Sequence, residues 1–460
     1  MDWVSRLKQI LGEDRVRDDE AHRMQYAHDE SRLDQPYPPD VVVHPTGLED
    51  VIQVMTFADK EKIPVVPRGG GTSVTGGSLA VHGGIMLVFD QMTEIKEISP
   101  GDLVAVVQPG IVTGVFHQAV EALGLFYPPD PASLDSCSLG GNVAENAGGP
   151  RALKYGVTKH YILELEVVLP GGTVYRVGRP TKKWVAGYDL VSLLVGSEGT
   201  LGVITEITLR LLPKPPHLET LLVSFPSVQA ASQAVTDIFL AGILPRTLEL
   251  MDRKAIDVVR EKTPPNLPPE TDAILIFEVD GQEHEVSVDL ERSAEIFFKH
   301  GALEILMAQN EGERARLWEA RRSVLPSLEA RYPKVRSEDL VFPRTLIPQA
   351  IEMAYEVEQQ TGVPLCTFGH IGDGNLHVNL LFEDEQDPKV EKALRMLYER
   401  TVTMGGTISG EHGIGFLKKK YLAIEQPPGL IQLQKAIKRV WDPGGILNPG
   451  KLFPENMGRL

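Results

Sequence analysis

PRGGGTSVTGGSL occupies residues 67–79 and directly follows the apolar segment IPVV at 63–66. Five of its thirteen residues are glycine and four carry a hydroxyl group. Glycine lets backbone N–H groups approach an anion closely, and serine and threonine add further donors. A strand that runs into such a loop is suited to a diphosphate, although a flexible surface loop has the same composition.

Two further glycine-rich segments follow in the same half of the chain. SLGGNVAENAGG spans residues 138–149, shortly after PPDPAS at 128–133, and VGSEGTLGVIT spans 195–205. Each segment alone is weak evidence. Three such loops in one α+β half of the chain favour a shared large ligand, of which a dinucleotide is the natural example.

Two familiar nucleotide-binding patterns do not fit this sequence. The Rossmann spacing G-x-G-x-x-G fails in the first loop, because Val74 stands where the third glycine is required. GILNPGKL (445–452) departs from the Walker A pattern at Leu452, where a serine or threonine would bind Mg²⁺. We therefore expect a dinucleotide bound by another fold, and no phosphate hydrolysis.

Composition and charge exclude several classes of function. Of 460 residues 42% are hydrophobic, which is enough for large cores in two or three domains. The net charge of −17 argues against nucleic acid or an anionic membrane surface as the main partner. Two cysteines, Cys137 and Cys366, are too few for an iron–sulfur cluster or a disulfide framework. With a charged N-terminus and no long apolar run, we expect a cytoplasmic protein, peripherally associated with a membrane only through a partner.

The order of elements favours an α+β fold with a boundary at KPPHLET (214–220). Before it, the patterns predict helices over 46–62 and 113–124 and a hairpin over 163–177. After it, a strand–helix–strand–strand–helix–strand order predicts an antiparallel sheet with helices on one face. We divide the chain into the segments 1–37, 38–216, 217–420 and 421–460.

Two histidines flank a turn in FGHIGDGNLHVNLL (368–381). Strand alternation puts His377 and Asn379 on one face. The turn-like IGDGN allows His370 to fold back beside His377. Two core or surface histidines beside a turn are the alternative interpretation.

SGEHGIG (409–415) places Glu411 between glycines, in an exposed and conformationally special position. Two histidines and a carboxylate are a common ligand set for a divalent metal, with open positions for a substrate. The candidate set is His370, His377 and Glu411. Their spacing matches no compact metal motif, so spacing alone does not establish a metal site.

Six segments in order carry a resemblance to a known family. They are PRGGGTSVTGG, SLGGNVAENAGG, GSEGTLGVIT, GHIGDGNLHVN, SGEHGIG and DPGGILNPGK. With them the chain resembles the FAD-linked 2-hydroxyacid dehydrogenases of the vanillyl-alcohol-oxidase superfamily, which include the glycolate oxidase flavin subunit, D-lactate dehydrogenase and D-2-hydroxyglutarate dehydrogenase. The resemblance implies a two-subdomain FAD-binding domain of the PCMH type over 38–216 and an α+β cap domain with an antiparallel sheet over 217–420. The N-terminal helical segment is 1–37, and 421–460 would return to the FAD domain.

The resemblance implies FAD as the cofactor. The FAD is expected to be non-covalent, because Thr72 follows the glycine triplet and the first loop lacks the histidine to which some relatives attach the flavin. From the tail, Lys451 is expected to contact flavin or substrate. The residues expected to bind FAD are Arg68, Gly69, Gly70, Gly71, Thr72, Ser73, Pro129, Asp130, Ser133, Gly140, Gly141, Asn142, Ala144, Asn146, Gly148, Gly199, Gly202, Ile204 and Asn448.

The same resemblance assigns roles to the histidine segments. In similar enzymes a divalent metal, Zn²⁺ or Mn²⁺, is bound by the residues that match His370, His377 and Glu411. Asn379 would orient the substrate, and His412 would be the general base.

The implied substrate is a small 2-hydroxy acid, namely D-lactate, glycolate or D-2-hydroxyglutarate, which would lose a hydride to FAD. Arg321 is the catalytic candidate for binding its carboxylate, with Arg344 as the alternative. The threonine that some relatives place four residues after this arginine is Leu325 here. Electrons would pass to an iron–sulfur or other electron-transfer subunit or to a quinone. A homodimer is expected, and nucleic acid is not expected as a partner.

Three alternatives stay open. The chain could be an electron-relay subunit of a larger complex without its own substrate, although the set of histidines and Glu411 argues against this. It could be a non-redox ether-lipid synthase of the same fold, but GEHGIG has one histidine where those enzymes carry a histidine-rich motif. A flavin-free metal-dependent hydrolase would leave the three glycine-rich loops unexplained.

Overall fold

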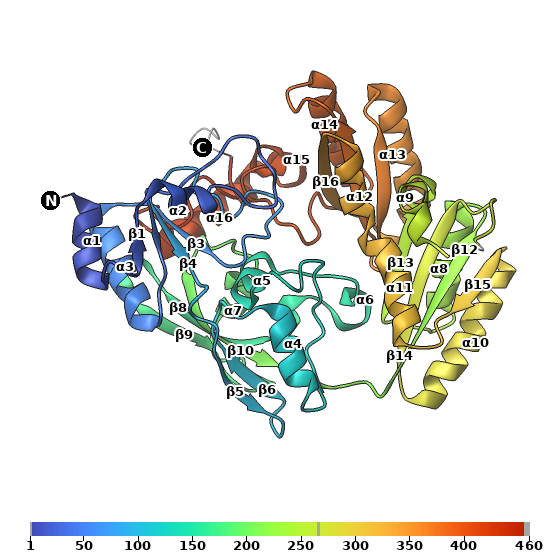
Figure 1. Cartoon of the computed structure of the whole chain (residues 1–460), viewed down its shortest axis with the longest axis horizontal. Coiled ribbons are helices and arrows are strands. Elements are labelled where there is room, and N and C mark those ends of the chain that lie inside the picture. Colours follow the sequence, from blue (N-terminus) through green and yellow to red (C-terminus); the bar gives the residue numbers. More distant parts are fainter. Residues whose placement is uncertain (1, 265–266, 455–460) are drawn as a thin grey trace. The chain divides into compact units, whose positions relative to one another are not determined.

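The computed structural model describes residues 2–264 and 267–454 (Figure 1). The chain divides into two compact units. Unit 1 comprises Met1–Ala147, Val157–Lys214 and Glu411–Leu460, and unit 2 comprises Gly148–Gly156 and Pro215–Gly410. Both units combine helices with sheets, which confirms the α+β class. Among the described residues, no helix is long and apolar enough to cross a membrane.

The first sheet of unit 1 carries the first glycine-rich loop at the end of one strand. Its order is β1-β2-β4-β3, with β2, β4 and β3 parallel and β1 antiparallel. Helix α3 (Leu48–Glu61), predicted over 46–62, buries Val51, Val54 and Met55 against this sheet. The other elements are α1 (Trp3–Leu11), β1 (Val16–Arg17), α2 (Glu20–Gln25), β2 (Val41–Val43), β3 (Val65–Arg68) and β4 (Ile85–Val88).

The second sheet of unit 1 is antiparallel throughout, in the order β5-β6-β10-β8-β9. The predicted hairpin over 163–177 is confirmed as β8 and β9. Near the C-terminus, Leu447 forms a parallel bridge with Val65, so the tail lies beside β3. The elements are β5 (Ile95–Ser99), β6 (Val104–Val107), α4 (Thr113–Glu121), α5 (Leu139–Glu145), β8 (Ile162–Val168), β9 (Val174–Gly178), α7 (Leu190–Leu194), β10 (Val203–Arg210) and α16 (Pro428–Trp441).

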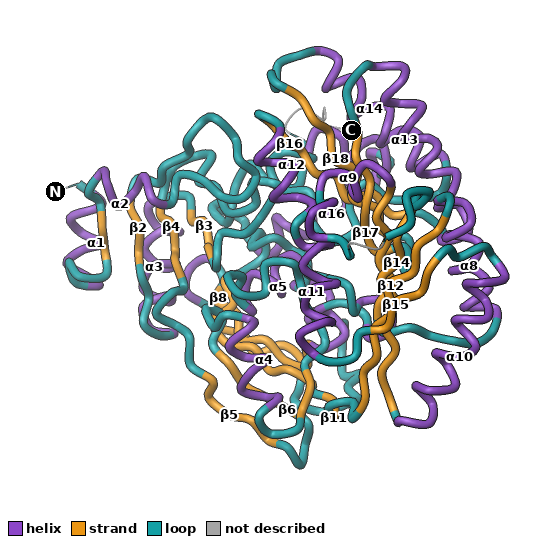
Figure 2. Tube along the Cα trace, turned by 45° about the vertical axis from the view of Figure 1, so that its right-hand side comes forward, coloured by secondary structure: helices purple, strands orange, loops and turns teal. Residues whose placement is uncertain are grey.

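Unit 2 is built on a seven-stranded antiparallel sheet in the order β15-β12-β14-β13-β17-β18-β16 (Figure 2). This confirms the predicted antiparallel sheet. The strands are β12 (His217–Phe225), β13 (Thr247–Asp252), β14 (Ala273–Gly281), β15 (Glu304–Met307), β16 (Lys334–Val341), β17 (Leu365–His370) and β18 (Asn375–Phe382).

Helices pack on both faces of this sheet, so the prediction of helices on one face is wrong. Phe225 and Phe277 contact Phe297 of α10 on one face. Their strand neighbours Leu222 and Ile274 point the other way and cluster with α9 and α12. The helices of unit 2 are α6 (Ala152–Tyr155), α8 (Val228–Leu240), α9 (Arg253–Val258), α10 (Glu283–Lys299), α11 (Glu311–Arg322), α12 (Val324–Arg331), α13 (Ile347–Thr361) and α14 (Pro388–Thr403).

Candidate active site

The first two glycine-rich loops pack backbone to backbone in unit 1. A Cβ atom added to Gly70 would lie 2.2 Å from the carbonyl oxygen of Ser136. A Cβ added to Gly69 would lie 2.1 Å from Ser138 Oγ, the hydroxyl that caps α5. Neither position has room for a side chain. The glycines therefore serve this close approach, and the two loops form one continuous surface of backbone groups.

The third loop and the C-terminal tail meet the first loop in the same unit. Gly199 has a φ of +67°, and a Cβ added there would lie 2.7 Å from Pro67 Cγ. Asn448 Nδ2 donates hydrogen bonds to the carbonyl oxygens of Gly77 at 2.9 Å and Glu198 at 2.8 Å. All three glycine-rich loops and the tail thus converge, as a shared dinucleotide would require.

Glu198 is a site residue that the sequence analysis missed, although it lies inside the quoted third loop. Its buried carboxylate accepts hydrogen bonds from the N–H groups of Ile414 at 2.8 Å and Gly415 at 2.7 Å. Burial raises the pKa of Glu198 despite these two bonds. Thr75 Oγ1 donates to the carbonyl oxygen of His412 at 3.2 Å. The backbone of the predicted general base is therefore fixed by two glycine-rich loops.

Several residues expected to bind FAD are engaged with protein groups. The Asn142 amide donates to Thr113 Oγ1 at 2.8 Å. Arg68 is buried and donates from Nη2 to the carbonyl oxygen of His28 at 2.8 Å. A Cβ added to Gly202 would lie 2.3 Å from Val167 Cγ1.

Arg68, Asn142 and Gly202 therefore contact protein groups and stabilise the loops. Gly148 alone of the expected set falls in unit 2. The remaining expected residues lie in unit 1: Gly71, Thr72, Ser73, Pro129, Asp130, Ser133, Gly140, Gly141, Ala144, Asn146 and Ile204.

Lys451 is buried beside the first loop. Its Nζ donates to the carbonyl oxygen of Leu79 at 2.6 Å and to Asn448 Oδ1 at 3.2 Å. Burial lowers the pKa of Lys451 to about 8, although Asp29 and Glu198 favour its charged form. The tail therefore brings a cation with a depressed pKa to the glycine-rich loops.

The histidine pair forms in unit 2, as the turn predicted. Strands β17 and β18 make a hairpin in which Phe368 lies opposite His377 and His370 lies opposite Asn375. Both histidines are buried, and their Nε2 atoms are 3.3 Å apart. Two imidazoles on one tetrahedral Zn²⁺ with bonds of about 2.05 Å would have nitrogens about 3.3 Å apart. The pair is therefore spaced for a shared ion.

Glu249 of β13 determines how His370 presents its ring. Its Oε1 pairs with His370 Nδ1, and its Oε2 accepts from Arg321 Nε at 2.9 Å. Burial opposes ionisation of Glu249, but His370 and Arg321 outweigh it and hold the pKa at about 2. An ionised carboxylate only accepts hydrogen bonds, so His370 carries its proton on Nδ1 and turns the lone pair of Nε2 toward His377. Glu249 could not be predicted from the sequence, because β13 carries two acidic residues and its partner His370 is 121 positions away.

Asp339 of β16 positions the segment that leads to Glu411. It is buried, lies opposite His377, and accepts hydrogen bonds from Ser409 Oγ at 3.2 Å and Gly410 N at 2.9 Å. Glu411 follows Gly410 by one peptide bond. One ligand atom from each of His370, His377 and Glu411 lies within 4.8 Å of the others. The three predicted metal ligands are thus brought together, and Asp339 is a supporting residue that sequence reasoning missed.

Asn379 is fully buried next to the histidine pair. Its Nδ2 donates to the carbonyl oxygens of Cys366 and His377, each at 3.1 Å. Its Oδ1 is buried without a hydrogen-bond partner in the described protein. A buried amide oxygen of this kind suits a hydrogen-bond donor of a ligand. Together with the spacing of the histidines, it fits a metal and a hydroxylated substrate.

The two candidate arginines lie on different faces of the unit 2 sheet. Arg321 lies 4.5 Å from the ring centroid of Phe368, on the face of His377. Arg344 lies 4.3 Å from the ring centroid of Phe239 in α8, which belongs to the opposite helical layer. The geometry favours Arg321 over Arg344 as the residue near the histidine pair. One edge of its guanidinium is bound to Glu249.

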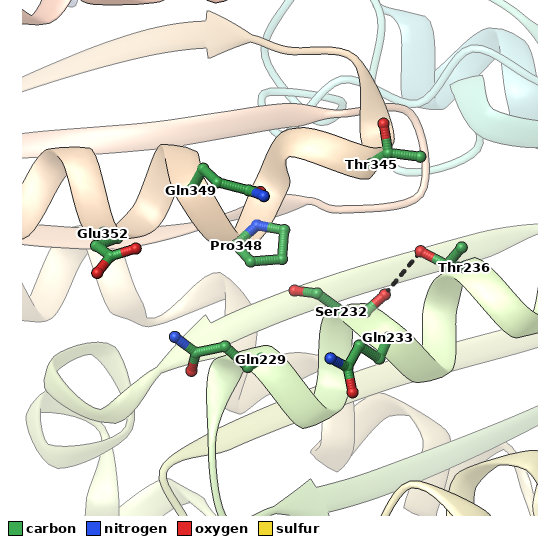
Figure 3. A pocket seen from close by; sticks show the side chains of 8 residues that line it. All are labelled: Gln229, Ser232, Gln233, Thr236, Thr345, Pro348, Gln349 and Glu352. Atoms are coloured by element: carbon green, nitrogen blue, oxygen red, sulfur yellow. Dashed lines mark hydrogen bonds between the residues drawn. The ribbon is translucent and has the colours of Figure 1, made fainter.

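A polar cavity of about 350 Å³ lies between α8 and α13 (Figure 3). It contains none of the predicted site residues. It is lined by α8, whose Phe239 contacts Arg344, so it lies on the Arg344 side of the sheet and is distinct from the histidine pair. Its walls are Gln229, Ser232, Gln233, Thr236, Thr345, Pro348, Gln349 and Glu352.

Two family models match most of the chain. The FAD binding domain matches residues 39–178, and the C-terminal domain of FAD linked oxidases matches residues 214–452. The chain belongs to the FAD-linked oxidases and is an FAD-linked oxidoreductase.

Named relatives and solved structures show which FAD-linked proteins this chain is similar to. The chain is 40% identical over 459 residues to glycolate oxidase subunit GlcD of Bacillus subtilis, covering 99% of this chain and 97% of the relative. It is 33% identical to D-lactate dehydrogenase of Anaerostipes hadrus, covering 97% and 94%. Among solved structures, p-cresol methylhydroxylase with substrate bound superposes with a TM-score of 0.81 at 19% identity, covering 99% and 97%. The fold is therefore of the PCMH type, as expected.

Proposed function

We propose that this chain oxidises a small D-2-hydroxy acid to the 2-oxo acid and passes the electrons to a partner. Glycolate and D-lactate are the first candidate substrates, because relatives at 40% and 33% identity carry these names. D-2-Hydroxyglutarate is the third. The relative named as a subunit of glycolate oxidase supports a separate electron-transfer subunit as the partner.

The observation that carries this proposal is the ligand set of His370, His377 and Glu411, with ligand atoms within 4.8 Å of one another. A metal-chelating substrate needs such a set with open positions, and a 2-hydroxy acid chelates through its hydroxyl and one carboxylate oxygen. Bound Zn²⁺ or Mn²⁺ would supply a Lewis acid that lowers the pKa of the substrate hydroxyl, and bound FAD would supply the hydride acceptor for the C2 hydrogen.

The protein residues then orient the substrate and move one proton. His412 accepts the hydroxyl proton, as a positioned imidazole can near neutral pH. Asn379 Oδ1 accepts a hydrogen bond from the substrate. Arg321 binds the substrate carboxylate with the edge of its guanidinium that Glu249 leaves available, because this group has five donors. These roles follow the family resemblance.

FAD itself would be held by the three glycine-rich loops of unit 1. Gly69 and Gly70 bring two loops together, and Asn448 ties the third loop to the first. The two cysteines, Cys137 and Cys366, are buried and unbridged, so the described chain offers no disulfide or cluster through which electrons could leave. Transfer to a partner subunit or to a quinone is therefore part of the proposal.

Steady-state oxidation with an artificial electron acceptor tests this function. Glycolate, D-lactate, L-lactate and D-2-hydroxyglutarate are compared, and the 2-oxo acid is quantified as its hydrazone. We expect turnover with one D-2-hydroxy acid or glycolate and loss of turnover in His412→Asn with FAD still bound. Bound FAD with no turnover of any acid would contradict the proposal and favour an electron-relay subunit.

A further inference from the structure

A second histidine pair lies in unit 1, among residues that the proposed function does not use. His22 is on α2, and His44 follows directly after β2. Their Nε2 atoms are 3.0 Å apart, and their ring planes meet at 64°. His44 is buried, whereas His22 is partly exposed. Two imidazoles thus turn the same ring nitrogen toward each other, and one of the two residues is partly exposed.

Asp90 determines which ring nitrogen of His44 carries the proton. Its Oδ1 lies 2.8 Å from His44 Nδ1. An ionised carboxylate only accepts, so His44 donates from Nδ1 and keeps a lone pair on Nε2. That lone pair faces the Nε2 of His22. A carboxylate behind a histidine is the usual support for a histidine that binds a metal.

The backbone holds both rings in place. His44 N donates to the carbonyl oxygen of Arg15 at 2.9 Å, which extends the pairing of β1 with β2. His22 N donates to Asp19, the residue that caps α2, at 3.0 Å. The Tyr26 ring packs against both imidazoles, with centroid distances of 5.4 and 6.0 Å. The pair is therefore built by three elements and does not depend on one mobile side chain.

The arrangement repeats that of His370 and His377. There the Nε2 atoms are 3.3 Å apart, and the ring centroids are 5.1 Å apart, against 5.2 Å for His22 and His44. In each pair one Nδ1 is bonded to a carboxylate, Glu249 in one and Asp90 in the other. The same donor geometry occurs twice in the chain, on unrelated elements.

We propose that His22 and His44 bind a divalent transition-metal ion of the Zn²⁺ class, with Asp90 positioning His44 from behind. Imidazole nitrogen suits Zn²⁺, Ni²⁺ and Cu²⁺ and disfavours Mg²⁺ and Ca²⁺. Tetrahedral coordination needs nitrogens about 3.3 Å apart, so the rings would open slightly from their present contact. Water would complete the coordination shell on the exposed side of His22.

The ion would connect α2 to the end of β2, an inner strand of the first sheet. Neither histidine belongs to the metal set of His370, His377 and Glu411, so this site is independent of the proposed activity. Its expected effect is structural, with slower opening of α2 and a raised melting temperature.

Zn²⁺ titration against a chromophoric chelator tests the site. The protein is the full chain, alone and in the His370→Ala, His377→Ala background, which removes the other metal set. The variants are His22→Ala, which changes a partly exposed residue and is expected to fold, His44→Gln and Asp90→Asn. The matched control is His284→Ala, an exposed histidine at the start of α10.

In the background chain we expect one Zn²⁺ to remain and to raise the melting temperature. His22→Ala and His44→Gln should abolish this binding, Asp90→Asn should weaken it about 10- to 100-fold, and His284→Ala should leave it unchanged. In the wild-type chain His22→Ala should lower the stoichiometry by one. No Zn²⁺ bound in the folded background chain, or binding unchanged by His22→Ala, would overturn the proposal.

Discussion

Glu249→Gln tests whether the buried Glu249 carboxylate contributes more to stability and metal binding than the carboxylate of an exposed ion pair would. Glu249 has a side chain that is 1% exposed, and its partner Arg321 is 11% exposed. The substitution removes the negative charge and leaves a buried guanidinium without its counter-ion. Breaking a buried pair in this way costs about 3–5 kcal/mol. Gln keeps the shape and one acceptor oxygen, so we expect about 3 kcal/mol, at the lower end of that range.

The same substitution should weaken metal binding. A neutral amide no longer fixes the proton of His370 on Nδ1, so the lone pair on Nε2 is no longer assured. Loss of such a supporting carboxylate typically lowers metal affinity about 10- to 100-fold. The matched control is Glu356→Gln, whose carboxylate pairs with Arg400 at 2.8 Å with side chains 55% and 31% exposed. An exposed pair contributes about 0–1 kcal/mol.

Two assays read these effects separately. Hydrogen exchange of peptides covering β13 and β17 reports local stability in unit 2 without assuming that both units unfold together. Competition with a chromophoric chelator reports Zn²⁺ affinity. Equal exchange in Glu249→Gln and Glu356→Gln, or unchanged Zn²⁺ affinity in Glu249→Gln, would show that Glu249 does not have this supporting role.

Further substitutions test other parts of the site. Gly70→Ala should abolish FAD retention, measured by the visible flavin spectrum of the purified protein, because its Cβ would lie 2.2 Å from a backbone oxygen. A Cβ added to Gly101 meets no atom within 4 Å, so Gly101→Ala should retain FAD in this assay. Asn448→Ala removes two hydrogen bonds at a residue with a φ of +39°, and should weaken FAD binding by about 1–3 kcal/mol in equilibrium titration. Burial raises the pKa of Asp252 from 3.8 to about 6. Between these two pH values the folded state binds more protons than the unfolded state, so the free energy of unfolding falls as the pH rises. The free energy of unfolding of Asp252→Asn, measured with denaturant, should therefore rise by about 3 kcal/mol relative to that of the wild type between pH 4 and 7. A difference between the two proteins that does not change with pH would contradict this. His412→Asn should retain FAD but reduce it orders of magnitude more slowly in single-turnover stopped flow, and an unchanged rate would remove its role as base.

The sequence was sufficient where local spacing determines structure. Alternation in 375–382 and the glycine-rich turn before it predicted that His370 and His377 would meet. The helix over 48–61 and the antiparallel sheet of unit 2 also followed from periodicity.

Residues that act through long-range contacts could not be found this way. Glu249 is 121 positions from His370, and Asp339 is 71 positions from Gly410. Each strand carries a second acidic residue, Asp252 in β13 and Glu338 in β16, and spacing along the chain does not indicate which partner each carboxylate contacts. The second face of the unit 2 sheet was missed for a related reason. Apolar periodicity can predict a helix, but it does not indicate on which face of a sheet that helix packs.

Oxidation of a D-2-hydroxy acid or glycolate through bound FAD is the activity that we propose for this chain. The most direct test is the visible spectrum of the purified protein during anaerobic addition of D-lactate, then glycolate, then D-2-hydroxyglutarate. We expect flavin absorption bands that bleach with one of these acids and persist with L-lactate. Flavin bands that persist with every acid, or a protein that shows no flavin bands even after FAD is added, would contradict it.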